Sequence, residues 1–193
     1  MSQRDDRTLA GLLFVGVPAG FLTVLMIGAA MAPGYHVGAD AISDLGVIDE
    51  TALLFNGAMV LTGLANALGG YYFYRVHGAR WLLGLFALSG IGSVGVGVFP
   101  LTTGAAHGIA AMAAFVGLNL EAIGTARVVD GAMQGVSVVA GVLGLLALAW
   151  FVAGGGEGGA LYGQLGYGGV ERLIVYPGLL WAVTLGGSLL TAD

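Results

Sequence analysis

Long apolar stretches alternate with short polar segments along the whole chain. The hydrocarbon core of a lipid bilayer is about 30 Å thick, and about 20 helical residues cross it. Six apolar stretches reach that length, and they occupy residues 9–31, 52–74, 81–99, 105–126, 132–152 and 173–190. The pattern therefore predicts an all-α integral membrane protein, in which residues 1–193 form one transmembrane domain built as a six-helix bundle.

The first and last stretches need separate interpretation. A cleaved secretory signal has an apolar core of about 7–15 residues, and the first stretch is longer, so we predict a retained span. Cleavage near the small residues 30–32 is the alternative. The last stretch contains Pro177, which a helix tolerates in its first turn because the missing N–H is not needed there. We expect Pro177 in that first turn.

The composition favours lipid as the solvent for much of the surface. Hydrophobic residues make up 58% of the chain and charged residues 9%, whereas a soluble domain carries about 25% charged residues. The chain has no cysteine, which excludes disulfides and thiolate chemistry. A net charge of −5 without a basic patch argues against nucleic-acid binding. An acidic chain without lysine suggests the composition of a halophilic archaeon.

Small residues are abundant, with 37 glycines in the chain. In lipid, stripes of small residues spaced four apart let helices approach closely. Two such stripes predict helix contacts, with chance as the alternative explanation because glycine is so common. They are Ser89, Ser93 and Gly97 in the third span, and Gly178, Ala182 and Gly186 in the sixth.

The arginines are distributed unevenly between the connections. Five of the six lie on the N-terminal segment and on the second and fourth connections, namely Arg4, Arg7, Arg75, Arg80 and Arg127. Cytoplasmic loops are enriched in positive charge, so we predict a multi-pass protein of the cell membrane with both termini in the cytoplasm. Connections 33–51, 100–104 and 153–172 are then exterior, and the glycine-rich segment 154–169 is expected to be a flexible loop.

Most other polar residues of interest fall on the predicted exterior side, at or near helix entrances. They are Tyr35, His36, Asp40, Ser43, Asp44, Asp49 and Glu50 on the first connection, Asn56 and His107 at the starts of spans two and four, and Glu171, Arg172 and Tyr176 where span six begins. This clustering predicts an exterior-facing polar pocket.

Two interpretations of this cluster remain open. His36, Asp44 and His107 include zinc-ligand types, but their spacing matches no known pattern, so no cofactor is expected and zinc is the weaker alternative. Arg172 either pairs with Asp44 and clamps the first connection onto span six, or binds a lipid phosphate.

Three polar residues lie within the spans themselves. Asn119 and Glu121 fall toward the cytoplasmic end of span four, and we expect the Glu121 side chain to reach the interface and meet Arg127 or Arg80. Asn66 lies midway along span two, where we expect it to bond a neighbouring helix.

Several short motifs resemble a known family. They are Ile42-Ser43-Asp44-Leu45-Gly46, Phe55-Asn56-Gly57, Phe99-Pro100 followed by His107, and Glu171-Arg172 with Tyr176-Pro177 and Trp181. Over nearly the whole chain they resemble the six-span prokaryotic family called domain of unknown function 998. A shorter similarity links the chain to the Frag1/DRAM/Sfk1 group, whose members are implicated in lipid remodelling, lipid asymmetry and autophagy. The resemblance implies six spans and importance for Ser43, Asp44, Asn56, His107, Glu171 and Arg172, without a defined chemistry.

We therefore predict a lipid-interacting protein whose exterior pocket binds or modifies a lipid headgroup. In this hypothesis Arg172 binds an anionic headgroup, and Asp44 and His107 orient it or act as base and acid. Ser43, Asn56, Glu171 and Tyr176 complete the substrate-binding set, and a lipid-modifying hydrolase or transferase stays open. The alternatives are a small solute or ion transporter with polar points at Asn56, Asn66, Asn119 and Glu121, and a structural partner of another membrane protein or of a second copy.

Overall fold

The computed structural model describes residues 2–191, and six long α-helices account for most of them. Each helix is long and apolar enough to cross a membrane, and no strand occurs among these residues. The helices are α1 (Gln3–Met31), α2 (Ala52–His77), α3 (Arg80–Val98), α4 (Ala105–Thr125), α5 (Ala132–Ala153) and α6 (Gly166–Thr191). Three short 3₁₀ helices lie between them, namely η1 (Ile42–Gly46), η2 (Leu101–Thr103) and η3 (Ala160–Tyr162). The predicted all-α architecture with six membrane-capable helices is confirmed.

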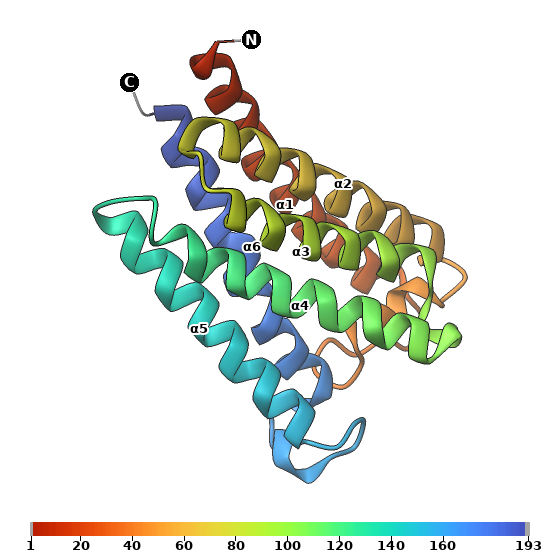
Figure 1. The fold of residues 1–193 in the computed structure, drawn as a ribbon. Helices are drawn as coiled ribbons and strands as arrows, with labels where there is room; N and C mark the ends of the chain where they lie inside the picture. The colour runs from red at the N-terminus through yellow and green to blue at the C-terminus, as the bar shows by residue number, and fades with distance from the viewer. Residues whose placement is uncertain (1, 192–193) are drawn as a thin grey trace.

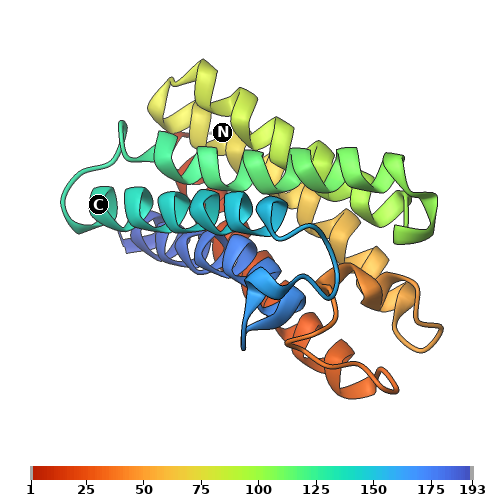
Figure 2. The same cartoon turned by 90° about the horizontal axis from the view of Figure 1, so that it is seen from below.

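The helices form a closed ring. Each helix packs against the next in sequence, α6 returns to pack against α1, and α4 also contacts α6 (Figure 1). The two chain ends lie at the same end of the bundle as the α2–α3 and α4–α5 connections (Figure 1), which we call the terminal end. The opposite end carries the α1–α2, α3–α4 and α5–α6 connections (Figure 2), and we call it the cap end.

Close contacts occur at both predicted stripes of small residues. A Cβ added at Gly97 would lie 2.9 Å from Val60 Cγ2 on α2, and one added at Gly186 would lie 2.7 Å from the Val15 nitrogen on α1. Real Cβ atoms essentially never come within 3.0 Å of such neighbours. Gly178 instead meets Leu118 on α4. The predicted close packing is confirmed, and the sixth-helix stripe serves two different partners.

Helix α6 begins at Gly166, seven residues before the predicted start at 173. Glu171 and Arg172 therefore lie inside the helix, and Pro177 lies in its interior instead of its first turn. Proline lacks the N–H that would bond the carbonyl four residues earlier. Beside this gap, Asn119 Nδ2 of α4 donates to the Ile174 carbonyl at 3.2 Å. The prediction for Pro177 was wrong because α6 begins earlier, in a glycine-containing segment whose low helix propensity does not predict a helix.

The glycine-rich connection is shorter and more structured than expected. Its last four residues, 166–169, belong to α6. Tyr162 in η3 is buried, its hydroxyl donates to the Phe151 carbonyl at 2.8 Å, and the Gly156 N–H donates to that hydroxyl at 3.2 Å. These bonds attach the connection to the end of α5.

Helix α1 also starts earlier than predicted, because the charged head is helical. Ser2 and Asp5 cap it reciprocally: the Asp5 N–H donates to Ser2 Oγ at 3.2 Å, and the Ser2 N–H donates to Asp5 Oδ2 at 2.9 Å. Such a capping box satisfies two N–H groups that the first helical turn leaves without partners. The other four helices agree with the predicted boundaries to within three residues.

Candidate functional site

Residues 32–51 fold over the cap end of the bundle, and we call this segment the cap. Within η1, Ile42 and Leu45 are buried and contribute to one of the two apolar core clusters. The cap backbone is largely non-helical, so its polar groups need partners from elsewhere when they are withdrawn from water. Several of the predicted site residues supply those partners.

Arg172 holds the cap against α6. Its Nη1 donates to the carbonyl oxygens of Val37 (2.7 Å), Gly168 (2.9 Å) and Asp40 (3.2 Å). Its Nη2 donates to the Tyr35 hydroxyl at 2.5 Å, and the guanidinium carbon lies 5.7 Å from the centre of that ring. The structure thus contains the predicted clamp, but its partners are backbone carbonyls and a tyrosine instead of the Asp44 carboxylate.

Acidic side chains bind N–H groups of the cap. Glu171 Oε2 accepts from the Ile42 N–H at 2.5 Å, and Asp44 Oδ2 accepts from the Ala41 N–H at 2.7 Å. The Tyr35 hydroxyl donates to the Ala41 carbonyl at 2.8 Å. Burial raises the pKa of Asp44, and the bond from Ala41 opposes that shift. Burial likewise raises the pKa of Tyr35. These groups fix the backbone on both sides of Ala41.

Asn56 joins η1 to the start of α2. Its Nδ2 donates to the Gly46 carbonyl at 2.9 Å, while Thr51 Oγ1 donates to the Leu45 carbonyl at 2.8 Å. A Cβ added at Gly46 would lie 2.6 Å from Asn56 Oδ1, so the contact requires glycine at this position. Asn56 therefore supports the C-terminal side of η1.

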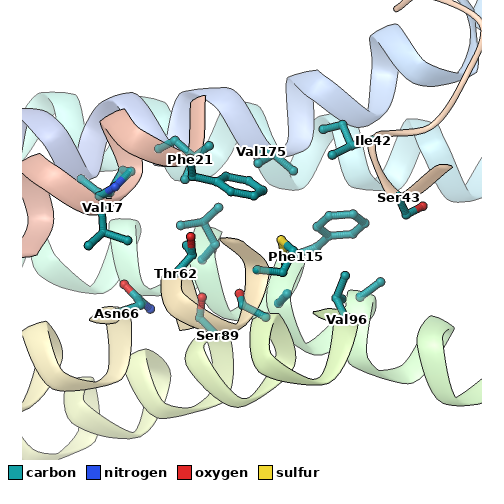
Figure 3. Close-up of a pocket in the computed structure, with 18 of the residues that line it drawn as sticks. Val17, Phe21, Ile42, Ser43, Thr62, Asn66, Ser89, Val96, Phe115 and Val175 are labelled. Carbon is teal, nitrogen blue, oxygen red and sulfur yellow. The ribbon is translucent and has the colours of Figure 1, made fainter. Parts of the chain in front are cut away.

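A cavity lies beneath the cap, between η1 and helices α1, α2, α3, α4 and α6. Its volume is about 80 Å³, and a single water needs roughly 10–15 Å³ by the same kind of measure. Its walls are mostly apolar, with Phe21, Phe115 and Val175 among them (Figure 3). Ser43 and Asn66 lie toward opposite ends of the lining in Figure 3. The cavity therefore extends from the cap into the middle of the bundle.

Polar side chains line this cavity at two levels. Ser43, His107 and Glu171 line it near the cap, and we call these three residues the mouth. Farther in, the polar lining residues come from two helices and are spaced four apart on each, namely Thr62 and Asn66 on α2 and Ser89 and Ser93 on α3. Residues four apart share one helix face, so both helices turn a polar edge to the cavity.

His107 has a defined tautomer in its neutral form. Its Nδ1 lies 2.8 Å from the Phe99 carbonyl oxygen at the end of α3. A carbonyl only accepts hydrogen bonds, so Nδ1 carries the proton and Nε2 is the acceptor in the neutral ring. The ring lines the cavity, which makes Nε2 the nitrogen suited to a ligand or a mobile proton.

The structure separates the predicted site residues into two groups. Ser43, His107 and Glu171 line the cavity, whereas Asp44, Asn56, Arg172 and Tyr176 do not. The His36 side chain is exposed, and the backbone N–H of His36 donates to Asp40 Oδ2 at 2.6 Å. Within residues 2–191 no group of three or more histidine, cysteine, aspartate or glutamate side chains is arranged to hold a metal ion.

Sequence reasoning missed the polar edges of the cavity. Ser89 and Ser93 were interpreted as packing residues, and Ser89 does pack against Gly117 of α4 as well as line the cavity. Thr62 was not among the predicted site residues. The available signal was the four-residue spacing of Thr62 and Asn66 within an apolar span.

The expectation for Glu121 was wrong. Its side chain is fully buried, and Oε2 accepts from Asn66 Nδ2 at 3.1 Å instead of meeting an arginine. Arg127 lies 5.7 Å over the Trp81 ring, and Arg80 Nε donates to the Tyr74 hydroxyl at 3.4 Å. Glu121 lies on the face of α4 that turns toward α2, so it cannot extend to the interface. The predicted bond of Asn66 to a neighbouring helix is confirmed.

Comparison with known proteins gives one match. The family model described as "Protein of unknown function (DUF998)" matches residues 14–188, which include most of α1, all of α2 to α5 and most of α6. No curated protein and no solved structure matches the chain significantly. The match covers most of the chain and coincides with the membrane-capable helices, so this is a multi-pass membrane protein that belongs to the DUF998 family.

Proposed function

We propose that this protein binds a membrane amphiphile, with an apolar segment of the ligand in the cavity and its polar end at the mouth. The observation that carries the proposal is the composition of the cavity wall: most lining residues are apolar, and Ser43, His107 and Glu171 gather at the mouth, apart from the polar edge that α2 and α3 turn to the deeper part. Ligand sites are commonly apolar clefts with a few polar groups that fix orientation. The small volume favours partial insertion of a slim chain over uptake of a whole lipid.

The charges around the mouth favour a particular kind of polar end. Glu171 places a carboxyl group at the mouth, and the Arg172 amino groups already bond three carbonyls and a tyrosine. An anionic headgroup at the Arg172 amino groups, as the sequence suggested, would have to displace those bonds, and the remaining donor, Nε, is buried. The arrangement favours a ligand that donates hydrogen bonds, such as a hydroxyl or an amine.

Catalysis on such a ligand stays a prediction. Of the acid–base pair expected from the sequence, His107 lines the cavity, while Asp44 bonds the Ala41 N–H outside it. The lipid association suggested by the distant similarity to the Frag1/DRAM/Sfk1 group is consistent with the binding proposal and stays a prediction as well.

Co-purification of lipid tests the proposal. Native mass spectrometry of gently purified protein is compared for Val175→Phe, which places a larger side chain in the cavity wall, and Leu180→Phe, a change on the exposed lipid-facing side of the same helix. We expect Val175→Phe to lose bound amphiphile at least several-fold and Leu180→Phe to retain it. Equal retention by both variants would contradict the proposal.

We further propose that the cap end faces the exterior, because five of the six arginines belong to segments at the terminal end. The chain has no cysteine, so single-cysteine variants report cleanly. Both Glu157 in the α5–α6 connection and Asp130 in the α4–α5 connection are exposed. An impermeant maleimide added to intact cells should label Glu157→Cys and not Asp130→Cys, and the reverse pattern would invert the topology.

A further inference from the structure

Glu121 has an incomplete set of partners. The residue is fully buried, and Asn66 Nδ2 donates to Oε2 at 3.1 Å. The other carboxyl oxygen, Oε1, is buried without any hydrogen-bond partner. A buried polar atom left unpaired in this way is costly, and an intramembrane acid is a candidate functional group.

Within residues 2–191, the Glu121 carboxyl group has an amide and not a charged group as its partner. Among residues 2–191, Asn66 bonds the Glu121 carboxyl group and the ion pair that the structure contains is Arg75 with Asp6. On the helices packed around α4, α5 carries no ionisable residue, and the Arg80 of α3 bonds Tyr74. On α2, Asn66 is the residue that contacts Glu121, while Arg75 pairs with Asp6 at 3.0 Å and His77 Nδ1 lies 3.1 Å from the Phe73 carbonyl.

The ionisable residues of α6 lie near the other end of the bundle. They are Tyr167, Glu171, Arg172 and Tyr176, all in the first three turns of a helix that starts at the cap end. A carboxylate at Glu121 would therefore be an unpaired charge in a low-dielectric interior, which is unfavourable relative to the protonated acid.

A polar route leads from the mouth to this acid. Asn66 contacts Glu121 and also lines the cavity. Ser89 lies beside Asn66 in Figure 3. Thr62 on α2 and Ser93 on α3 line the cavity one helical turn nearer the cap end. Hydroxyl groups both donate and accept hydrogen bonds, and the cavity volume of about 80 Å³ is enough for several waters at roughly 10–15 Å³ each. Waters placed between these hydroxyl groups would complete a hydrogen-bonded chain that carries protons.

The next polar side chain of α4 toward the terminal end is already engaged. One turn farther toward the terminal end, Thr125 is fully buried, and its Oγ1 donates to the Glu121 backbone carbonyl at 2.8 Å. That hydroxyl is therefore engaged within the helix. The polar route thus approaches Glu121 from the cap end.

We propose that Glu121 is a proton-binding site that exchanges protons with the cap-end face through the cavity. A hydronium ion in the cavity transfers its proton to the carboxylate, which becomes a neutral carboxylic acid, and a water molecule remains in the cavity. The hydrogen bond from Asn66 Nδ2 to Oε2 orients the carboxyl group, so that Oε1 is the oxygen that takes the proton. The site itself rests on Glu121 and Asn66 and not on the proposed amphiphile, whereas the route requires water in the cavity and is therefore open only when no amphiphile is inserted.

Infrared difference spectroscopy of the full-length protein in lipid vesicles tests the proposal. The carbonyl stretch of a protonated carboxylic acid is distinct from the carboxylate bands and shifts when the proton is exchanged for deuterium. We expect a band that titrates with pH and exchanges in heavy water, that is lost in Glu121→Gln and that persists in the exposed control Glu157→Gln. Absence of such a band, or its persistence in folded Glu121→Gln, would overturn the proposal.

A second variant keeps the test decisive if Glu121→Gln does not fold. Asn66→Ala retains the carboxyl group and removes the Asn66 Nδ2 donor to Oε2, so the band should move in frequency. An unchanged band in Asn66→Ala would assign it to another acid and overturn the proposal. For the route, Val175→Phe in the cavity wall should slow deuterium exchange of the band several-fold relative to Leu180→Phe, and equal rates would exclude entry through the cavity.

Discussion

Glu171 and Glu121 are both buried glutamates facing the inside of the bundle, but their surroundings differ. Glu171 lies at the cap end, where its carboxyl group accepts from a backbone N–H and its neighbour Arg172 bonds three carbonyls. Glu121 lies deeper, with one amide donor and one unpaired oxygen. The comparison indicates that burial alone does not identify a functional acid. The first residue supports a segment of backbone, whereas the second has an unsatisfied atom beside a polar cavity.

The largest expected effect is at Arg172. Truncation in Arg172→Ala leaves the carbonyls of Val37, Asp40 and Gly168 without this donor. Hydrogen bonds that involve a charged group contribute about 1.5–3 kcal/mol each, and Gly168 is buried whereas Val37 and Asp40 are partly exposed, so we expect a loss of roughly 3–5 kcal/mol in unfolding free energy, measured by denaturant titration in detergent. Arg127→Ala is the control, because an exposed cation over a ring contributes about 0.5–1 kcal/mol. Similar losses for the two variants would refute the clamp.

The next effect compares two adjacent glycines of α6. A Cβ at Gly168 would collide with the Asp40 carbonyl of the cap, whereas a Cβ at Gly169 would make an ordinary contact of 3.4 Å with Leu165. Alanine is favoured over glycine inside a helix by up to about 1 kcal/mol. Gly169→Ala should therefore stabilise slightly, and Gly168→Ala should destabilise by about 1–3 kcal/mol through overpacking. Thermal unfolding midpoints shifted in the same direction would argue against the close contact of α6 with the cap.

The pattern of apolar residues predicts most of the fold, and the helix boundaries that it misses have local causes. The six spans follow from length and hydropathy, because a segment that crosses lipid must pair its own backbone N–H and C=O groups, and a helix does so. The early start of α6 was missed because Gly166, Gly168 and Gly169 have low helix propensity, and their helix is stabilised by contact with the cap. That contact joins residues more than a hundred positions apart, as in the bond from Arg172 to Val37.

The candidate site was only partly predictable for the same reason. The sequence pointed to Ser43, His107 and Glu171, which do share a cavity. It grouped them with Asp44 and Asn56, which instead bond the cap backbone. Which face of α4 carries Glu121 depends on how the six helices rotate in the ring, and a single sequence does not specify that rotation.

A smaller effect separates the two glutamates directly. In Glu171→Gln the amide oxygen still accepts from the Ile42 N–H, but a neutral amide is a weaker acceptor than a carboxylate. We therefore expect a loss of about 1–2 kcal/mol in unfolding free energy. Glu121→Gln preserves the bond from Asn66 and fills the same space, so its stability should change by less than about 1 kcal/mol. Denaturant titrations of both variants at one pH provide the measurement, and a larger loss at Glu121 would assign it a structural role.

The smallest effect concerns Asp44 and its pH dependence. Burial raises the pKa of this carboxyl group in the folded protein, so the folded state binds a proton at higher pH than the unfolded state does. As pH falls through the folded pKa toward the unfolded one, Asp44 therefore contributes increasing stability, and above the folded pKa its charge opposes folding. Asp44 is half-buried and screened by solvent, so the contribution should stay below about 1 kcal/mol. Asp44→Asn, whose amide oxygen can still accept from Ala41, should flatten the stability profile at acidic pH, from the raised folded pKa down to the ordinary aspartate value of about 3.9. A profile that becomes steeper in Asp44→Asn would show that the stability of the cap depends on the charge of Asp44. The hydrogen bond from the Ala41 N–H would then not suffice to explain the role of this residue.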